Sequence, residues 1–283
     1  MFFVRVRSIV GIALGVLLTV SYVCSQTPNV AKPEPTPAVT TKATPVPTPK
    51  PVVLDPSKPL TAEQIVDASL FIYGFGGGRQ LLNQIRKTTI EKGRSTFTAA
   101  DGKVQTATFQ RWIIRADSLN KEKIRLDQEF SNARYALVFS DDKIFGIYNN
   151  TVFQPREDAA KLFENNIFHG VEALLRYKEN ESTIELGGRD KLMGVDLYMI
   201  DVTDKQNRKT RFFVSAKSWR VMMVTYEEGG VKYKRKFYDQ KYTQGTLVPY
   251  RSVLTANDKV VEENEVLSVT YGQKVDEDLF KAG

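Results

Sequence analysis

The sequence predicts an α+β fold in which antiparallel strands dominate. Alternating segments joined by short polar turns fill the C-terminal hundred residues or so, which is the pattern of an antiparallel meander. Helical periodicity is confined to the start of the domain and to one central segment. Strands and helices do not alternate along the chain, which argues against a parallel nucleotide-binding sheet.

Residues 1–25 have the composition of a secretory signal peptide. Two arginines precede an apolar run over 8–23, and we expect cleavage before Gln26. Cleavage there would remove Cys24, the only cysteine, so the mature chain would have no thiol nucleophile, disulfide or cysteine metal site. A retained anchor and lipidation of Cys24 stay open, although the run is short for a membrane span. We therefore expect an exported protein of the bacterial periplasm or cell envelope.

Residues 26–59 are expected to form a disordered tether. This segment holds ten of the twelve prolines of the chain, together with many threonines and lysines and no aromatic residue. Such a composition cannot bury enough apolar surface to offset the conformational entropy of an ordered chain. We expect an extended, semi-rigid spacer with polyproline character.

Residues 60–283 are expected to form a single domain of nearly balanced charge. The chain has a net charge of +7, of which the signal segment and the tether each contribute two positive charges, leaving +3 on the domain. That balance does not favour a nucleic-acid partner. The densest basic run, Lys232 to Lys236, alternates with apolar residues and is interpreted as the solvated face of a strand.

The first element of the domain is a helix over 60–73. Thr61 and Gln64 have the spacing of a capping box, and Gly74 is placed to end the helix. A short second helix is expected around 79–86, after a glycine cluster that does not match a phosphate-binding loop.

From Thr88 onward the pattern changes to strands, interrupted by helical periodicity over 157–177. A hairpin is expected across Asp141 and Asp142. The expected strands cover 106–115, 136–139, 143–148, 183–186, 195–202, 211–214, 221–226, 231–238, 248–254 and 265–271.

No residue pattern predicts catalysis. His169 is the only histidine, so a histidine-based zinc site or a catalytic triad is hard to build, and we expect this residue to pack or to cap a helix. Adjacent carboxylates such as Glu227 and Glu228 would point to opposite faces of a strand and would not work as an acid–base pair. We expect no enzymatic activity, no cofactor and no metal.

Several strands are apolar on both faces, among them the segments 197–200, 212–214 and 221–224. Such strands need cover on both sides by helices, by a second sheet or by a ligand. Methionine is frequent in these strands, and its flexible side chain suits a surface that contacts variable acyl chains. Ordinary core packing is the alternative interpretation.

The order of several segments resembles the outer-membrane lipoprotein-sorting (LolA/LolB-like) superfamily of periplasmic carriers. The likeness covers roughly the whole domain, and each motif alone is weak. The long proline-rich tether is unusual for the soluble carriers, and the residues before Cys24 do not match the lipid-anchored receptor. The segments that resemble the family are Leu60–Gly78, Gly187–Ile200, Arg211–Trp219, Tyr238–Arg251 and Val275–Phe280.

The resemblance implies a curved antiparallel sheet, an incomplete β-barrel, with helices packed on its concave side. It also implies a non-enzymatic carrier or receptor that holds the acyl chains of a lipoprotein or lipid in an apolar cavity. The apolar strands suggest a set of cavity-lining residues, although no residue role transfers from the family: Trp112, Ile114, Phe145, Ile147, Met199 and Met222.

The alternative function is an envelope-tethered structural or protein-interaction module without a lipid ligand. We expect a monomer that binds no nucleic acid. Peripheral association with a membrane and a protein partner in the envelope stay open.

Overall fold

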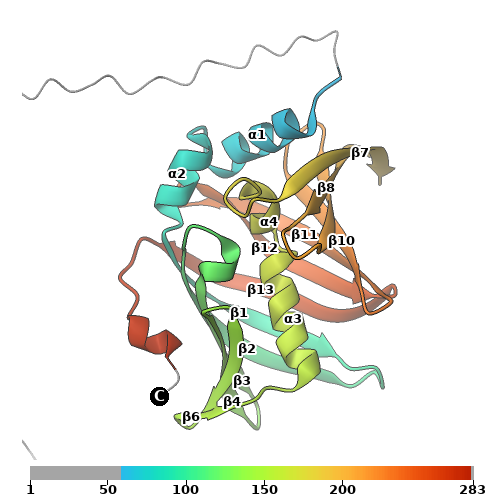
Figure 1. Cartoon of the computed structure of the whole chain (residues 1–283). Helices are drawn as coiled ribbons and strands as arrows, with labels where there is room; N and C mark the ends of the chain where they lie inside the picture. Colours follow the sequence, from blue (N-terminus) through green and yellow to red (C-terminus); the bar gives the residue numbers. More distant parts are fainter. Residues whose placement is uncertain (1–58, 282–283) are drawn as a thin grey trace, which may run out of the picture. The chain divides into compact units, whose positions relative to one another are not determined.

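The computed structural model describes residues 59–281, which form one antiparallel sheet of thirteen strands with helices packed against it (Figure 1). The predicted signal peptide and all of the predicted tether except Pro59 lie outside the described residues. The strands are β1 (Thr88–Thr98), β2 (Val104–Ile114), β3 (Lys123–Phe130), β4 (Arg134–Ser140), β5 (Lys143–Tyr148), β6 (Thr151–Phe153), β7 (Thr183–Leu192), β8 (Val195–Thr203), β9 (Lys209–Ser215), β10 (Val221–Glu228), β11 (Val231–Thr243), β12 (Thr246–Ala256) and β13 (Lys259–Tyr271).

The helices are α1 (Ala62–Tyr73), α2 (Gly78–Ile85), α3 (Glu157–Phe168) and α4 (Val171–Leu175), with short 3₁₀ turns at Leu119–Lys121 and Glu277–Phe280. The capping box predicted for the first helix is confirmed: the backbone N–H of Gln64 donates to the side chain of Thr61, and the backbone N–H of Thr61 donates to Gln64. No helix within the described residues is long and apolar enough to cross a membrane.

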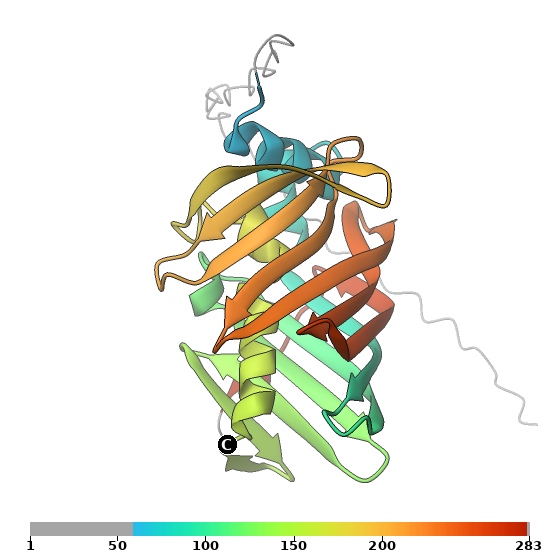
Figure 2. The same cartoon turned by 90° about the vertical axis from the view of Figure 1, so that its right-hand side faces the viewer.

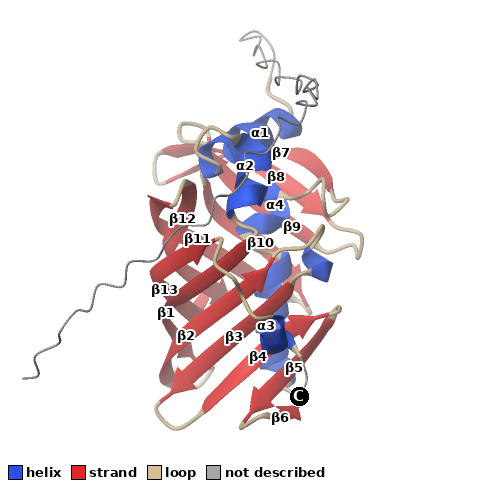
Figure 3. Ribbon diagram, turned by 90° about the vertical axis from the view of Figure 1, so that its left-hand side faces the viewer, coloured by secondary structure: helices blue, strands red, loops and turns tan. Residues whose placement is uncertain are grey.

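The strand order explains why the barrel is open. It runs β6-β5-β4-β3-β2-β1-β13-β12-β11-β10-β9-β8-β7, so the first and last strands of the chain are neighbours at the centre of the sheet. β6 and β7 form its two edges and do not pair, which leaves the barrel open. The predicted fold class, a curved antiparallel sheet with helices on its concave side, is confirmed (Figures 2 and 3).

The central helices connect the two edges of the sheet. α3 and α4 lie between β6 and β7 in the sequence, so the chain passes from one edge to the other through them. Figure 1 shows both helices between the two arms of the sheet. The helical segment predicted over 157–177 is divided into two helices: α3 ends at Phe168 with His169 as its C-cap, and Gly170, whose backbone is extended, is the N-cap of α4.

Tight turns connect most neighbouring strands. The predicted hairpin turn at Asp141 and Asp142 is confirmed, and both residues have positive φ angles, 52° and 60°. Asn257 and Asp258 repeat this conformation between β12 and β13. Turns of this kind match the right-handed twist of the flanking strands, and asparagine and aspartate tolerate the conformation best after glycine.

The main apolar core lies on the concave side of the sheet. Ile65 and Leu70 of α1 and Leu174 of α4 are almost completely buried there, against strand residues that include Phe139 and Phe212. A second, smaller apolar cluster forms around Leu197, Phe213 and Met223, which alternate along their strands with residues of the main core and so face the convex side.

Candidate ligand-binding cavity

A cavity of about 250 Å³ lies between the concave face of the sheet and the helix α3. Strands β1, β2, β3, β10, β11, β12 and β13 contribute to its wall, and the helices cover it from the other side. The cavity therefore occupies the space that the open-barrel topology encloses between sheet and helices.

One part of the wall is apolar. It consists of side chains from β2, β3 and α3, all of which except Phe109 belong to the main core or pack against it. These residues are Phe109, Ile113, Ile124, Leu126, Phe163 and Ile167.

Gly93 in β1 makes room for this apolar part. A Cβ atom at this position would lie 2.5 Å from the ring of Phe109 and 2.3 Å from the carbonyl oxygen of Glu265. The register between β1 and β13 also shifts between Lys92 and Gly93, which marks a β-bulge. The missing side chain thus lets the ring of Phe109 lie against the backbone of the next strand.

Two charge pairs form a polar part of the wall. The Nη2 of Arg111 donates to both carboxylate oxygens of Glu91 at 2.8 Å. The Nη2 of Arg235 donates to Glu262 at 2.6 Å, and the same guanidinium contacts Asn166 of α3 and Ser252 of β12. Arg235 therefore ties the covering helix to the sheet at the level of the cavity.

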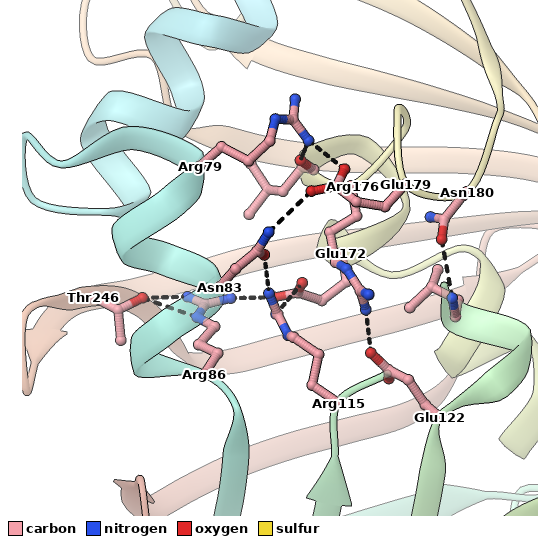
Figure 4. A network of polar contacts seen from close by, with 12 residues as sticks. Arg79, Asn83, Arg86, Arg115, Glu122, Glu172, Arg176, Glu179, Asn180 and Thr246 are labelled. Atoms are coloured by element: carbon pink, nitrogen blue, oxygen red, sulfur yellow. Dashed lines mark hydrogen bonds and ion pairs between the residues drawn. The ribbon is translucent and has the colours of Figure 1, made fainter. Parts of the chain in front are cut away.

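A third charge cluster closes the end of the cavity nearest α4 (Figure 4). Arg86 at the end of α2 and Arg115 after β2 both donate to the carboxylate of Glu172 in α4, and Arg115 lies 2.5 Å from it. Burial alone would raise the pKa of Glu172, but the guanidinium groups of Arg115 and Arg86 more than offset it and lower the pKa to about 2. Glu172 is therefore ionised over the physiological pH range.

A deeper ion pair supports this cluster. Arg176 is almost completely buried, donates to Glu122, and also donates to the carbonyl oxygen of Ala116 at 2.5 Å. Burial raises the pKa of Glu122 to about 7, against the opposing effect of the Arg176 guanidinium. Arg79 and Asn83 extend the network by donating to Glu179 at 2.5 and 3.0 Å. The network fixes α2, α4 and the ends of β2 and β12 to one another.

His169 lies at the boundary between α3 and the cavity wall. It is buried at the C-terminal cap of α3, as predicted for a packing or capping residue. Its ring stacks on Tyr226 with centroids 3.9 Å apart, and its Nδ1 lies 2.6 Å from the hydroxyl of Thr210. Burial lowers the pKa of His169 to about 4, so the ring is neutral near pH 7.

Two polar atoms of the lining lack a hydrogen-bond partner. The hydroxyl of Tyr73, on a side chain that is only 1% exposed, is one, and the Nε of Arg111 is the other. Buried polar groups usually have partners, so these two atoms are exceptions, and both expose almost no surface.

The six residues predicted to line a cavity lie elsewhere. Trp112 and Ile114 alternate with Arg111 and Ile113 and so face the convex side, where the guanidinium of Arg125 lies over the indole of Trp112. Phe145 and Ile147 likewise alternate with Ile144, which packs on the main core.

Of the six predicted residues, the two methionines, Met199 and Met222, lie in the same apolar cluster. Both pack on the small convex-side cluster of Leu197, Phe213 and Met223. None of the six predicted residues belongs to the wall of the cavity described above, and their role in ligand binding stays a prediction.

Sequence reasoning missed the charged residues of the cavity. The interpretation of the basic run Lys232 to Lys236 as the solvated face of a strand is wrong for Arg235, because this side chain shares its face with Tyr233 and Phe237 and is buried. A usable signal was present: Arg235 and Arg111 each have large apolar residues two positions away on both sides. Within residues 59–281, no group of three or more histidine, cysteine or carboxylate side chains is placed to hold a metal ion.

Comparison with known proteins supports the fold. No protein-family model matches the sequence, and no curated protein matches it. Among solved structures, a DUF1329 family protein from Desulfovibrio piger has a TM-score of 0.57 and 12% identity, covering 78% of this chain and 97% of its own. A LolA superfamily protein from Nitrosomonas europaea has a TM-score of 0.55 and 11% identity, covering 79% of this chain and 98% of its own.

These similarities concern the fold alone, because the sequence identities are low. They confirm that the described domain has a LolA-like fold over nearly the full length of both neighbours. The resemblance found in the sequence is therefore correct at the level of the fold. The function has to be inferred from the cavity itself.

Proposed function

We propose that this protein is a non-enzymatic carrier or receptor that binds an acyl chain of a lipid or lipoprotein in the cavity beneath α3. The cavity with one apolar part of its wall is the observation that supports this function. Sites for small ligands are typically concave, mostly apolar and equipped with a few placed polar groups, and this cavity has all three properties.

The size of the cavity limits the ligand. Its volume of about 250 Å³ lies just below the range of roughly 300–1,000 Å³ that is usual for ligand pockets. We therefore expect one acyl chain to enter, with the apolar wall of β2, β3 and α3 around it. The expected export and the proline-rich tether would place such a carrier in the bacterial envelope.

A matched pair of substitutions on one strand tests the proposal. Ile113 lines the cavity, whereas its neighbour Ile114 faces the convex side. The binding of a dansyl-labelled fatty acid, and separately of its methyl ester, would be titrated by fluorescence with the wild-type protein and with Ile113→Trp and Ile114→Trp.

The proposal predicts that at least one probe binds the wild-type protein. Ile113→Trp should weaken binding about tenfold or more because the indole fills the cavity, while Ile114→Trp should bind as the wild type does. No binding of either probe, or loss of binding in Ile114→Trp alone, would contradict the proposal. The second result would support the convex-side residues predicted from the sequence.

A further inference from the structure

We infer that the cavity prefers an uncharged amphiphile, an acyl chain that carries an ester, amide or hydroxyl group, over a free fatty acid. We further infer that Glu91 determines this preference. Both statements rest on the proposed function and specify the chemical class of its ligand.

The first step of the argument is the charge of the lining. Four arginines and four glutamates line the cavity, so the formal charges of the wall are balanced, with Glu122 only partly ionised at neutral pH because burial raises its pKa to about 7. The arginines are Arg86, Arg111, Arg115 and Arg235, and the glutamates are Glu91, Glu122, Glu172 and Glu262.

The second step is that the guanidinium groups are already engaged. Arg86 donates to Glu172, to the hydroxyl of Thr246 at 2.6 and 2.9 Å and to the carbonyl oxygen of Leu247 at 2.8 Å. Arg115 donates to Glu172 and to Asn83. Arg235 is divided among Glu262, Asn166 and Ser252. A ligand carboxylate would have to displace one of these partners.

Arg111 is the guanidinium that the wall leaves most open. Its side chain is 33% exposed, and its Nη2 donates to both carboxylate oxygens of Glu91. A partly exposed guanidinium whose charge is already neutralised suits the oxygen of an ester, amide or hydroxyl, which accepts a hydrogen bond without bringing a charge.

A carboxylate is disfavoured by the same arrangement. Removing an ionised carboxylate from water is costly unless an opposite charge compensates it, and Glu91 already compensates Arg111. The carboxylate of Glu91 is only 10% exposed and would lie close to the incoming negative charge. Glu91 therefore works as a specificity determinant through its pairing with Arg111.

The test compares the dansyl-labelled fatty acid with its methyl ester, which share the same chain. We expect the wild-type protein to bind the ester about tenfold or more tightly than the acid. In Glu91→Gln, the uncompensated Arg111 should shift the preference toward the acid by about tenfold, and the double variant Glu91→Gln/Arg111→Gln should lose this shift.

Glu263→Gln is the matched control, because Glu263 pairs with Arg251 at 2.6 Å, next to the cavity-lining Glu262 on β13. It makes the same change in net charge and should leave the preference unchanged. Equal binding of the two probes or tighter binding of the acid by the wild type would overturn this inference and leave the proposed function intact. Binding of neither probe would overturn the proposed function, and this inference with it.

Discussion

Gly93 shows how a single residue shapes the cavity. The ring of Phe109 and the carbonyl oxygen of Glu265 occupy the space that a side chain on Gly93 would need. The carbonyl oxygen belongs to the backbone of β13, so it cannot move aside as the end of a flexible side chain can. Gly93 therefore permits both the bulge of β1 and the position of the Phe109 ring in the cavity wall.

Gly93→Ala should destabilise the protein by about 1–3 kcal/mol, the usual cost of overpacking a well-packed site. Urea unfolding followed by circular dichroism measures the change. Arg94→Ala is the control on the adjacent, solvent-facing position, where the ion pair with Glu265 is more than half exposed, and it should cost less than about 1 kcal/mol. Equal effects of the two substitutions would contradict the close approach described here.

His169 links the folded state to pH. Burial lowers its pKa to about 4, from an ordinary value near 6.5. Between these two values the unfolded chain binds a proton that the folded protein does not bind. The stability that the neutral ring contributes is therefore complete above about pH 6.5 and is lost as the pH falls toward 4.

His169→Phe should remove this part of the pH dependence while keeping a ring stacked on Tyr226. The wild-type protein should lose up to about 3 kcal/mol more stability than the variant on acidification from pH 7 to pH 4. Free energies of unfolding, measured by urea titration of both proteins between pH 7 and pH 4, test this difference. Parallel curves for the two proteins would show that the pKa of His169 does not differ between the folded and the unfolded state, which would contradict this account.

At the scale of elements, α4 depends on a single carboxylate. Glu172 connects this five-residue helix with Arg86 beside α2 and Arg115 beside β2. A helix this short has little stability of its own, so its position comes from tertiary contacts. The network in Figure 4 therefore fixes the position of α4 and, with it, the end of the cavity.

Glu172→Gln should destabilise the protein by about 2–3 kcal/mol, because two largely buried guanidinium groups lose their counter-charge. The expected cost stays below that of a completely buried pair, since the Glu172 side chain keeps 26% of its surface exposed. Asp158→Asn in the exposed pair with Arg156 is the comparison and should cost less than about 1 kcal/mol. Thermal and urea unfolding of both variants measure the difference, and a cost of Glu172→Gln no larger than that of Asp158→Asn would contradict this role.

The elements could be predicted from the sequence where local chemistry decides them. The capping box of α1 and the aspartate pair between β4 and β5 both act within a few residues, and both occur as expected. β3 was missed because charged residues such as Arg125 and Asp127 interrupt its apolar pattern. These two side chains pair with each other at 2.6 Å in the folded sheet.

The faces of the strands could not be predicted in the same way. β2 carries large apolar side chains on both faces, so alternation separates Ile113 from Ile114 without saying which one meets α3. The answer depends on where the crossing helices lie, which is a property of the whole chain. The ion pairs of the cavity were missed for the same reason, since Arg235 and Glu262 are 27 residues apart and meet only across the sheet.

At the scale of the whole molecule, the topology and the cavity have one origin. Because β1 pairs with β13, the two edge strands lie far apart in the sheet, and the helices that connect them must pass along the concave face. A barrel that closed on itself would leave no such passage. The space between the crossing helix α3 and the sheet is the cavity that we assign to the acyl chain.

Native mass spectrometry tests this central claim most directly. The protein would be produced in a host with bacterial membranes, purified without detergent and measured beside Ile113→Trp and Ile114→Trp. The account predicts one bound lipid per protein in the wild type and in Ile114→Trp, and loss of that lipid in Ile113→Trp. A wild-type protein that carries no lipid, or a lipid that persists in Ile113→Trp, would contradict it.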